Sequence, residues 1–341
     1  MATAEQPAAE EHRFAGFVRV VAKGSKLSRA LSRDEAETAM RMILAGAAEP
    51  VQIGAFLAVL RYRKETAEEL AGFVAAARDT IDRAPALRAE LDWPSYADRH
   101  KQLPYFLLAA LLLAANGVRV LIHCIAGDGP ASTPACLAAL GIRPAASAAE
   151  AAAAIDRDCF AYLPLGVFCP ALDALFDLRP LLGLRSPANT YARELNPAAA
   201  PCQMQGVFHP NYIDLHQTAA RLLGQPQAAI FKGAGGEAQR NPNKPCRVAL
   251  LSDGVPTLEE WAAVLPDDRF GWREEPLRPD RLVSLWRGED DAAAPTAAIV
   301  GTAAIALRLL GRTSGQAEAE ALAREMWTNR PKSLYPARGD R

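Results

Sequence analysis

The sequence lacks the features that mark several common classes of protein. Its six cysteines include no Cys-x-x-Cys pair, so no zinc-finger or thioredoxin spacing is present. The formal net charge is −1, which gives no overall attraction to nucleic acid and leaves only local basic segments for such contacts. The apolar run Phe106–Ala115 is too short to span a membrane, and residues 1–12 lack the apolar core of a signal peptide. We therefore expect a cytoplasmic protein with reduced thiols and no membrane partner.

Glycine is missing from a place where an α/β protein often needs it. Segment 92–102 follows a helical region and precedes an apolar run, which predicts a strand-to-helix junction. A phosphate cradle at such a junction uses glycines, because backbone N–H groups must approach the anion closely. This segment instead contains the rings of Trp93 and Tyr96 and the consecutive side chains of Arg99, His100 and Lys101. A ligand at this junction would not be held by a glycine-rich loop.

Residues 14–80 are patterned as amphipathic helices. Ser32-Arg-Asp-Glu35 and Thr66-Ala-Glu-Glu69 are capping boxes, in which the hydroxyl and the carboxylate satisfy free backbone N–H groups. Pro50 is suited to the first position of the helix between them. Apolar residues recur at helical spacing after each of these starts. The pattern predicts three helices of about three to four turns that bury one face on each other or on a partner.

After residue 85 short apolar runs alternate with helical segments. This alternation is typical of a mostly parallel sheet covered by helices, and the sequence predicts an α/β fold. The polar, glycine-rich turns between the elements are then candidate walls of a site at the carboxyl ends of the strands. The predicted strands are Val118–Ile122, Phe160–Leu163, Met204–Phe208, Ala228–Phe231 and Arg247–Leu251. The predicted helices are Thr133–Leu140, Ala148–Ile155, Leu172–Leu182, Tyr212–Leu223, and segments near 293–311 and 315–327.

Several motifs together resemble anthranilate phosphoribosyltransferases. Leu31–Ala36, Pro50–Leu57 and Lys64–Phe73 are similar to the helical domain of that family, and Arg179–Gly183 and Glu194–Pro197 to the segments that follow later. The resemblance implies a nucleoside phosphorylase/phosphoribosyltransferase-type fold. It implies a helical dimerisation domain at 14–85 joined by 172–200, an α/β domain at 88–171 and 201–330, and flexible tails at 1–12 and 331–341. It also implies a homodimer formed through the helical domain.

The motifs that would carry the family's chemistry are changed. The diphosphate loop GTGGD falls on 92–96, and of the KHGN motif only His123 remains. Of the acidic pair that holds Mg²⁺ in the family, one carboxylate, Glu237, remains. These features resemble the divergent YbiB-type (TrpD2) branch of the family, whose members are described as nucleic-acid-binding proteins.

Two hypotheses therefore follow. The first is a non-catalytic, sequence-independent nucleic-acid (DNA) binder, in which basic side chains contact phosphates and Trp93 or Tyr96 stacks on bases. Its candidate phosphate contacts are Arg19, Lys23, Lys26, Arg29, Arg99, His100, Lys101, Lys232, Arg240 and Lys244. The second is a glycosyl or phosphoribosyl transferase of altered substrate, with Mg²⁺ as its cofactor. Its residual pocket would contain His123, Ser132, Thr133, Arg179, Asn189 and Glu237.

Each residue of that pocket also has a structural interpretation. Ser132 or Thr133 is placed to cap the helix that follows, and a lone histidine at a strand end is usually structural. Arg179 is equally well explained by a surface ion pair. The sequence identifies no metal site and no catalytic residue by itself.

Overall fold

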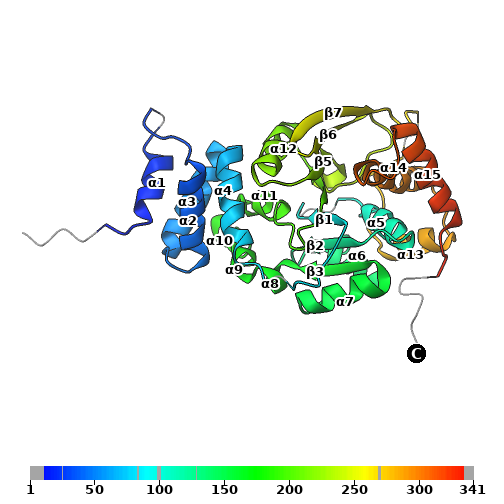
Figure 1. Ribbon diagram of the computed structural model, residues 1–341, viewed down its shortest axis with the longest axis horizontal. Coiled ribbons are helices and arrows are strands. Elements are labelled where there is room, and N and C mark those ends of the chain that lie inside the picture. Colours follow the sequence, from blue (N-terminus) through cyan, green and yellow to red (C-terminus); the bar gives the residue numbers. More distant parts are fainter. Residues whose placement is uncertain are drawn as a thin grey trace, which may run out of the picture.

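The chain forms a helical lobe and an α/β lobe that lie side by side along the long axis of the molecule (Figure 1). The computed structural model describes residues 11–24, 26–82, 84–97, 101–127, 129–267 and 270–333. Arg99, His100 and most of the two predicted flexible tails lie outside these residues. Among the described residues, no helix is long and apolar enough to cross a membrane.

The helical lobe begins with α1 (Ala15–Ala22), α2 (Arg33–Leu44), α3 (Pro50–Arg63) and α4 (Ala67–Arg78). Both predicted capping boxes are present, and Pro50 opens α3 as expected. The interior is a chain of edge-to-face rings: the centroids of Phe14 and Phe56 are 5.3 Å apart, and those of Phe56 and Phe73 are 6.0 Å apart. Such pairs add about 0.5–1.5 kcal/mol to the stabilisation from the area that they bury.

The α/β lobe is built on one seven-stranded sheet in the order β3-β2-β1-β4-β5-β6-β7. Its strands are β1 (Leu91–Ser95), β2 (Val120–Cys124), β3 (Phe160–Pro164), β4 (Cys202–Val207), β5 (Gln227–Lys232), β6 (Cys246–Ser252) and β7 (Val255–Trp261). The first five strands are parallel, which confirms the predicted sheet type, and the last two are antiparallel. The β6–β7 turn consists of Asp253 and Gly254, with φ of 48° and 83°. Positive φ at both positions is what a two-residue hairpin turn requires.

Helices cover both faces of the sheet. One face packs against α5 (Phe106–Ala115), α6 (Thr133–Ala139), α13 (Asp280–Arg287), α14 (Ala293–Leu309) and α15 (Gln316–Asn329). The other face packs against α7 (Ala148–Asp158) and α12 (Ile213–Leu222). The second of these cores continues into the helical lobe, so the two lobes share one buried interior.

The predicted helix 172–182 is wrong. The structure has α8 (Leu165–Phe168), α9 (Pro170–Asp173), α10 (Arg179–Leu182) and α11 (Ala188–Arg193), with turns between them. Pro180 explains the break, because its ring would clash with the carbonyl four residues earlier in a continuous helix. The segment returns to the helical lobe, where Tyr191 packs against Phe73 with ring centroids 4.8 Å apart.

Candidate functional site

The candidate site lies at the carboxyl ends of the parallel strands, where ligands of open α/β sheets usually bind. The segment after β1 is held there by contacts from three other parts of the chain. The backbone N–H of Ala97 donates to Glu237 Oε1 at 2.7 Å. The carbonyl of Tyr96 accepts from Arg185 Nη2 at 2.6 Å and from Asn189 Nδ2 at 3.1 Å. The position of the expected diphosphate loop is therefore fixed by internal hydrogen bonds.

The predicted stacking role of Trp93 and Tyr96 is contradicted by their burial. Both side chains are 0% exposed. Trp93 stacks on Phe106 with centroids 6.0 Å apart, in the core below α5. Tyr96 packs edge-to-face against His123. Neither ring can meet a base unless the core opens, so both are structural residues.

Tyr96 ends a buried polar chain. Its hydroxyl lies 2.7 Å from His123 Nδ1, and His123 Nε2 lies 3.3 Å from Asp92 Oδ2. All three side chains are 0% exposed. Burial raises the pKa of Tyr96 well above its ordinary value, so the hydroxyl keeps its proton. The imidazole links two strands and holds Tyr96 in place, which supports the structural interpretation of the histidine.

The predicted hydroxyl residues are also engaged. Ser132 caps α6, where its Oγ accepts from the backbone N–H of Ala135 at 3.4 Å. Thr133 Oγ1 lies 2.8 Å from Ser95 Oγ. The capping interpretation is therefore correct for Ser132, and the hydroxyl of Thr133 joins α6 to the end of β1. Arg179 lies half-buried in α10.

A second buried network joins the sheet to α11 and α12. Gln203 Nε2 donates to Asp92 Oδ2 at 2.7 Å, Gln205 Nε2 donates to Glu194 Oε2 at 2.8 Å, and Glu194 Oε1 lies 2.6 Å from His216 Nδ1. Sequence reasoning did not identify these residues. The available signal was the alternation Cys-Gln-Met-Gln in β4, because a period of two places both amides on the same face of the strand.

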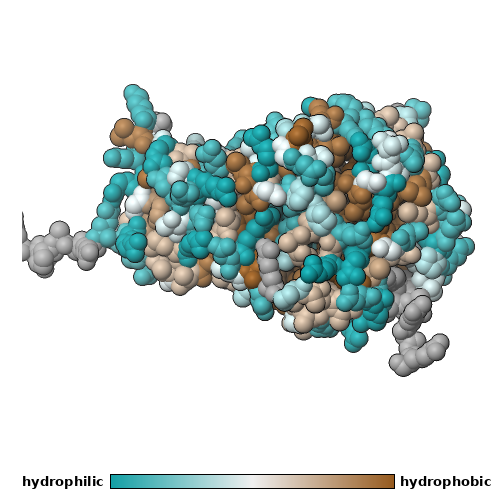
Figure 2. Space-filling model, in the orientation of Figure 1, coloured by the Kyte–Doolittle hydropathy of each residue, from teal (hydrophilic) through white to brown (hydrophobic). Residues whose placement is uncertain are grey.

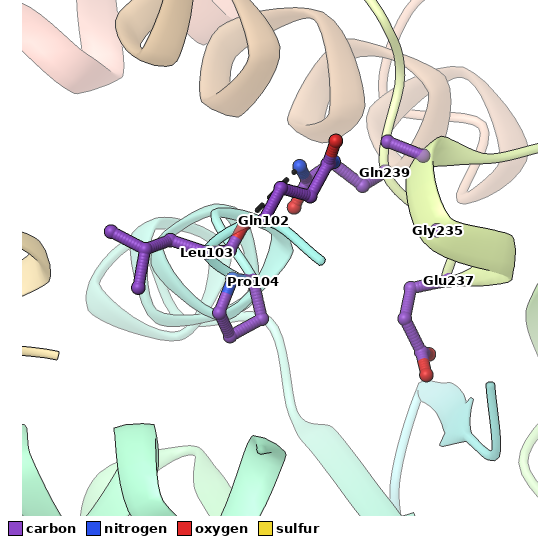
Figure 3. Close-up of a pocket in the computed structure, with 7 residues that line it drawn as sticks. Gln102, Leu103, Pro104, Gly235, Glu237 and Gln239 are labelled. Atoms are coloured by element: carbon purple, nitrogen blue, oxygen red, sulfur yellow. Dashed lines mark hydrogen bonds between the residues drawn. The ribbon is translucent and has the colours of Figure 1, made fainter. Parts of the chain in front are cut away.

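A small pocket opens beside this region. It is lined by Gln102, Leu103 and Pro104 before α5, and by Ala234, Gly235, Glu237 and Gln239 after β5. Gln239 reaches toward Leu103, whereas the carboxylate of Glu237 points away toward the end of a strand (Figure 3). Its free volume is about 10 Å³, which is room for about one water molecule.

The residues present do not fit a magnesium–diphosphate clamp. Mg²⁺ requires near-octahedral oxygen ligands from carboxylates and phosphates. Glu237 already accepts a hydrogen bond from Ala97, and Asp92 faces His123 and Gln203. Within the described ranges, no group of three or more His, Cys, Asp or Glu side chains could hold a metal.

The predicted basic contacts that lie within the described residues fall into three groups. Lys23, Lys26, Lys101, Lys232 and Lys244 are exposed. Arg19 and Arg29 are exposed but form ion pairs, Arg19 with Glu11 and Arg29 with Glu35 at 2.6 Å. Arg240 is 0% exposed, so its predicted phosphate contact is wrong.

Arg240 is buried because the fold uses its charge internally. Its guanidinium donates to Glu320 at 2.7 Å and to the carbonyl of Ala262 at 2.5 Å, and it lies 5.2 Å from the centre of the Trp261 ring.

The exposed lysines do not surround one cleft. Lys23 and Lys26 follow α1, which lies at the outer end of the helical lobe, far from the sheet (Figure 1). Lys232 and Lys244 instead lie at the carboxyl edge, and Lys101 precedes Gln102, which lines the pocket at this edge. Lys232 ends β5, and Lys244 comes two residues before β6, whose first residues run antiparallel to the end of β5. We name these three residues the edge lysines.

The surface over the sheet is mixed in character. Figure 2 shows hydrophilic residues interspersed with apolar ones over this face of the α/β lobe. Among the large apolar side chains at the surface are Phe208, directly after β4, and Val255 and Leu258 in β7, which are 59%, 59% and 50% exposed. The carboxyl edge therefore presents an aromatic ring together with its lysines.

Comparisons with known proteins agree with this architecture. Residues 18–81 match the family model described as "Glycosyl transferase family, helical bundle domain". The crystal structure of anthranilate phosphoribosyltransferase from Thermus thermophilus superposes with a TM-score of 0.75 and 26% identity. The match covers 91% of this chain and 94% of that one. The fold is thus that of the phosphoribosyltransferases.

Sequence relatives define the family. An anthranilate phosphoribosyltransferase of Methylocella silvestris is 31% identical over 240 residues, 69% of this chain and 67% of the relative. The uncharacterized protein YbiB of Escherichia coli is 28% identical over 251 residues, 72% of this chain and 78% of the relative. The chain belongs to the anthranilate phosphoribosyltransferase family.

Proposed function

We propose that this chain is a non-catalytic, sequence-independent nucleic-acid-binding member of its family. The observation that carries the proposal is the filling of the diphosphate position by the buried chain Asp92–His123–Tyr96. Phosphoribosyl transfer depends on positioning and on stabilising charge around a diphosphate. Here the groups at that position are bonded to each other, and the carboxylate of Glu237 is occupied by a backbone N–H.

The positive side of the proposal is the charge at the same edge. The edge lysines Lys101, Lys232 and Lys244 are exposed, and Glu237 beside them is buried. Exposed lysines contact phosphates as point charges without reading sequence, and they release counterions when they do so. A phosphate backbone that follows this edge would meet all three ammonium groups without entering the protein.

The test is the salt dependence of binding to a fluorescent single-stranded oligonucleotide. Each phosphate contact contributes about −0.7 to the slope of log K against log salt, so reversing all three edge lysines to Glu should flatten the slope by about 2. Arg324→Glu, an exposed position on α15, is the matched control and should leave the slope nearly unchanged. Absence of any binding by the unmodified protein at low salt would refute the proposal.

A transferase of altered substrate is the second candidate, and family membership favours it. The small pocket between Gln102 and Gly235 lies at the edge where such a substrate would bind, and Glu237 is one of its lining residues. Titration calorimetry with phosphoribosyl diphosphate and Mg²⁺ tests this candidate. Saturable binding heat that is lost in Glu237→Gln supports the transferase function. The absence of any binding heat rules it out.

We further propose that the chain forms a homodimer through its helical lobe. Val51 on α3 and Leu181 on α10 are 77% and 81% exposed. The two helices are adjacent, because Leu182 lies against Gly54. Exposed apolar side chains on adjacent helices form a shared apolar surface, and such contiguous surfaces are typical of interaction sites. Light scattering should give the mass of a dimer, and Val51→Glu with Leu181→Glu should give the monomer.

A further inference from the structure

We propose that Phe208 is the base-stacking residue of the carboxyl edge and that the ligand of this edge is single-stranded. The inference deepens the nucleic-acid function proposed above and rests on it. Phe208 directly follows β4 and is 59% exposed. An aromatic ring gains stacking energy from a base of any identity, which suits sequence-independent binding.

Packing within the protein does not account for this exposure. Trp93 and Tyr96 at the neighbouring strand end are 0% exposed, so the fold readily buries rings here. In the described part of the chain, the other large apolar side chains that are at least half exposed belong to the helical lobe and its return segment or to the β6–β7 hairpin. They are Leu27, Val51, Tyr62, Leu181, Val255 and Leu258. Among the described large apolar side chains that are at least half exposed, Phe208 is therefore the one at the carboxyl edge of the sheet.

The ring of Phe208 contacts a second ring on one side. His209 meets it edge-on, with centroids 4.8 Å apart and planes at 80°. His209 in turn begins a short turn, in which its carbonyl accepts from the backbone N–H of Tyr212 at 3.0 Å. The hydroxyl of Tyr212 lies 3.4 Å from Arg61 Nη1 on α3. Phe208 therefore immediately precedes a turn that contacts the helical lobe through Tyr212 and Arg61.

The backbone beneath the ring is closely packed. A Cβ added to Gly236, whose φ is 92°, would lie 3.2 Å from the Cβ of Phe208 and 3.4 Å from that of Ala97. A Cβ on Gly206 or Gly233 would lie 2.0 Å or 1.5 Å from backbone atoms of Glu237. These close approaches fix the end of β4 against the loop after β5. The backbone that carries the ring is therefore already ordered before a ligand stacks on it.

One exposed cation lies on the strand beside the ring. Val207, the residue before Phe208, is in register with Lys232 on β5, and Lys232 is exposed. An exposed acid nearby in sequence is Asp214, in the first turn of α12. Bases within a duplex are already stacked on each other, so an exposed ring with a neighbouring cation suits an unpaired strand.

The experiment separates stacking from phosphate contact. Binding is measured for oligothymidylate and for an abasic backbone of the same length, across a range of salt concentrations. The unmodified protein should bind the thymidylate roughly 5- to 150-fold more tightly than the abasic strand, the factor expected for one stacked base. Phe208→Leu should reduce this ratio to about 1 while leaving the salt slope unchanged. Lys232→Gln should flatten the salt slope while leaving the ratio unchanged.

A third variant provides rescue and a spectroscopic readout. Phe208→Trp should keep the base preference, and its added indole fluorescence should be quenched by thymidylate and not by the abasic strand. Because Phe208 is exposed, its variants should unfold at the same temperature as the unmodified protein. A full base preference in Phe208→Leu would overturn the inference and leave the proposed function standing. No binding of either strand by the unmodified protein would instead refute the proposed function.

Discussion

Replacing Tyr96 with phenylalanine removes one buried hydroxyl and leaves His123 Nδ1 without its partner at 2.7 Å. Both side chains are fully buried, so no water can replace the lost hydrogen bond. Leaving a buried polar group unsatisfied costs about 1–3 kcal/mol. At roughly 2 °C per kcal/mol for a protein of this size, the melting temperature should fall by about 4 °C.

Tyr191→Phe is the matched control. Tyr191 is also 0% exposed, but its hydroxyl has no hydrogen-bond partner within the described residues. Removing that hydroxyl should cost nothing or add slightly to stability. Calorimetric unfolding of the two variants is the assay. If Tyr96→Phe unfolds at the same temperature as Tyr191→Phe, the polar chain does not hold this region together and the argument for a filled site fails.

The alkaline pH dependence gives an independent check on Tyr96. Burial raises the pKa of Tyr96 in the folded protein above the value of about 10 that it has when unfolded. The folded state therefore binds this proton more tightly. The contribution of this tighter proton binding to the free energy of unfolding is fully present below about pH 10 and is lost as the pH rises above 10. Tyr96→Phe lacks this loss, so the difference in unfolding free energy between the variant and the unmodified protein should narrow above about pH 10.

Three further predictions concern residues outside that chain. The hydrogen bond from Arg29 lowers the pKa of Glu35 to about 2. Arg29→Gln should therefore slightly lower the urea midpoint at neutral pH. The difference in midpoint between Arg29→Gln and the unmodified protein should disappear as the pH falls from about 4.5 to 2. Arg240→Met removes a buried guanidinium whose partner Glu320 is partly exposed, and it leaves the carbonyl of Ala262 without that donor, so it should cost about 1–3 kcal/mol in urea unfolding without changing the salt slope of binding. Gly206→Ala should destabilise the protein because its Cβ would meet backbone 2.0 Å away, whereas Gly16→Ala, in open space within α1, should stabilise it by about 0.5–1 kcal/mol in thermal melts.

Local signals predicted much of the fold. The capping boxes at Ser32 and Thr66 identified two helix starts, because a cap is a contact between residues three positions apart. The sequence-based prediction did not include β7, although Asp253-Gly254 is a typical two-residue hairpin turn and was the signal available for it. The helix predicted through Pro180 failed because proline is tolerated only in the first turn of a helix, and here it lies in the first turn of a separate short helix, α10.

The candidate site was harder to predict because burial there depends on distant residues. Trp93 and Tyr96 lie in a polar-looking segment, and their burial is decided by partners such as Phe106 and His123 in other elements. Arg240 lies in a basic stretch of sequence, yet Glu320 neutralises it from the far end of the chain. Sequence spacing shows which charges are adjacent along the chain. It does not show which oppositely charged side chain lies next to each charged residue in the folded protein.

The position of the exposed positive charge determines how the two proposed functions can be distinguished. A phosphate bound inside the old site would have to displace the hydrogen bonds of Tyr96 and Ala97 and would then be shielded from salt. The edge lysines are exposed, so a phosphate that meets them remains in water and incurs no burial cost. Its binding must then weaken steeply as salt rises. A weak salt dependence with a saturable small ligand would place the binding inside the fold, and a steep one with a polymer would place it on the edge lysines.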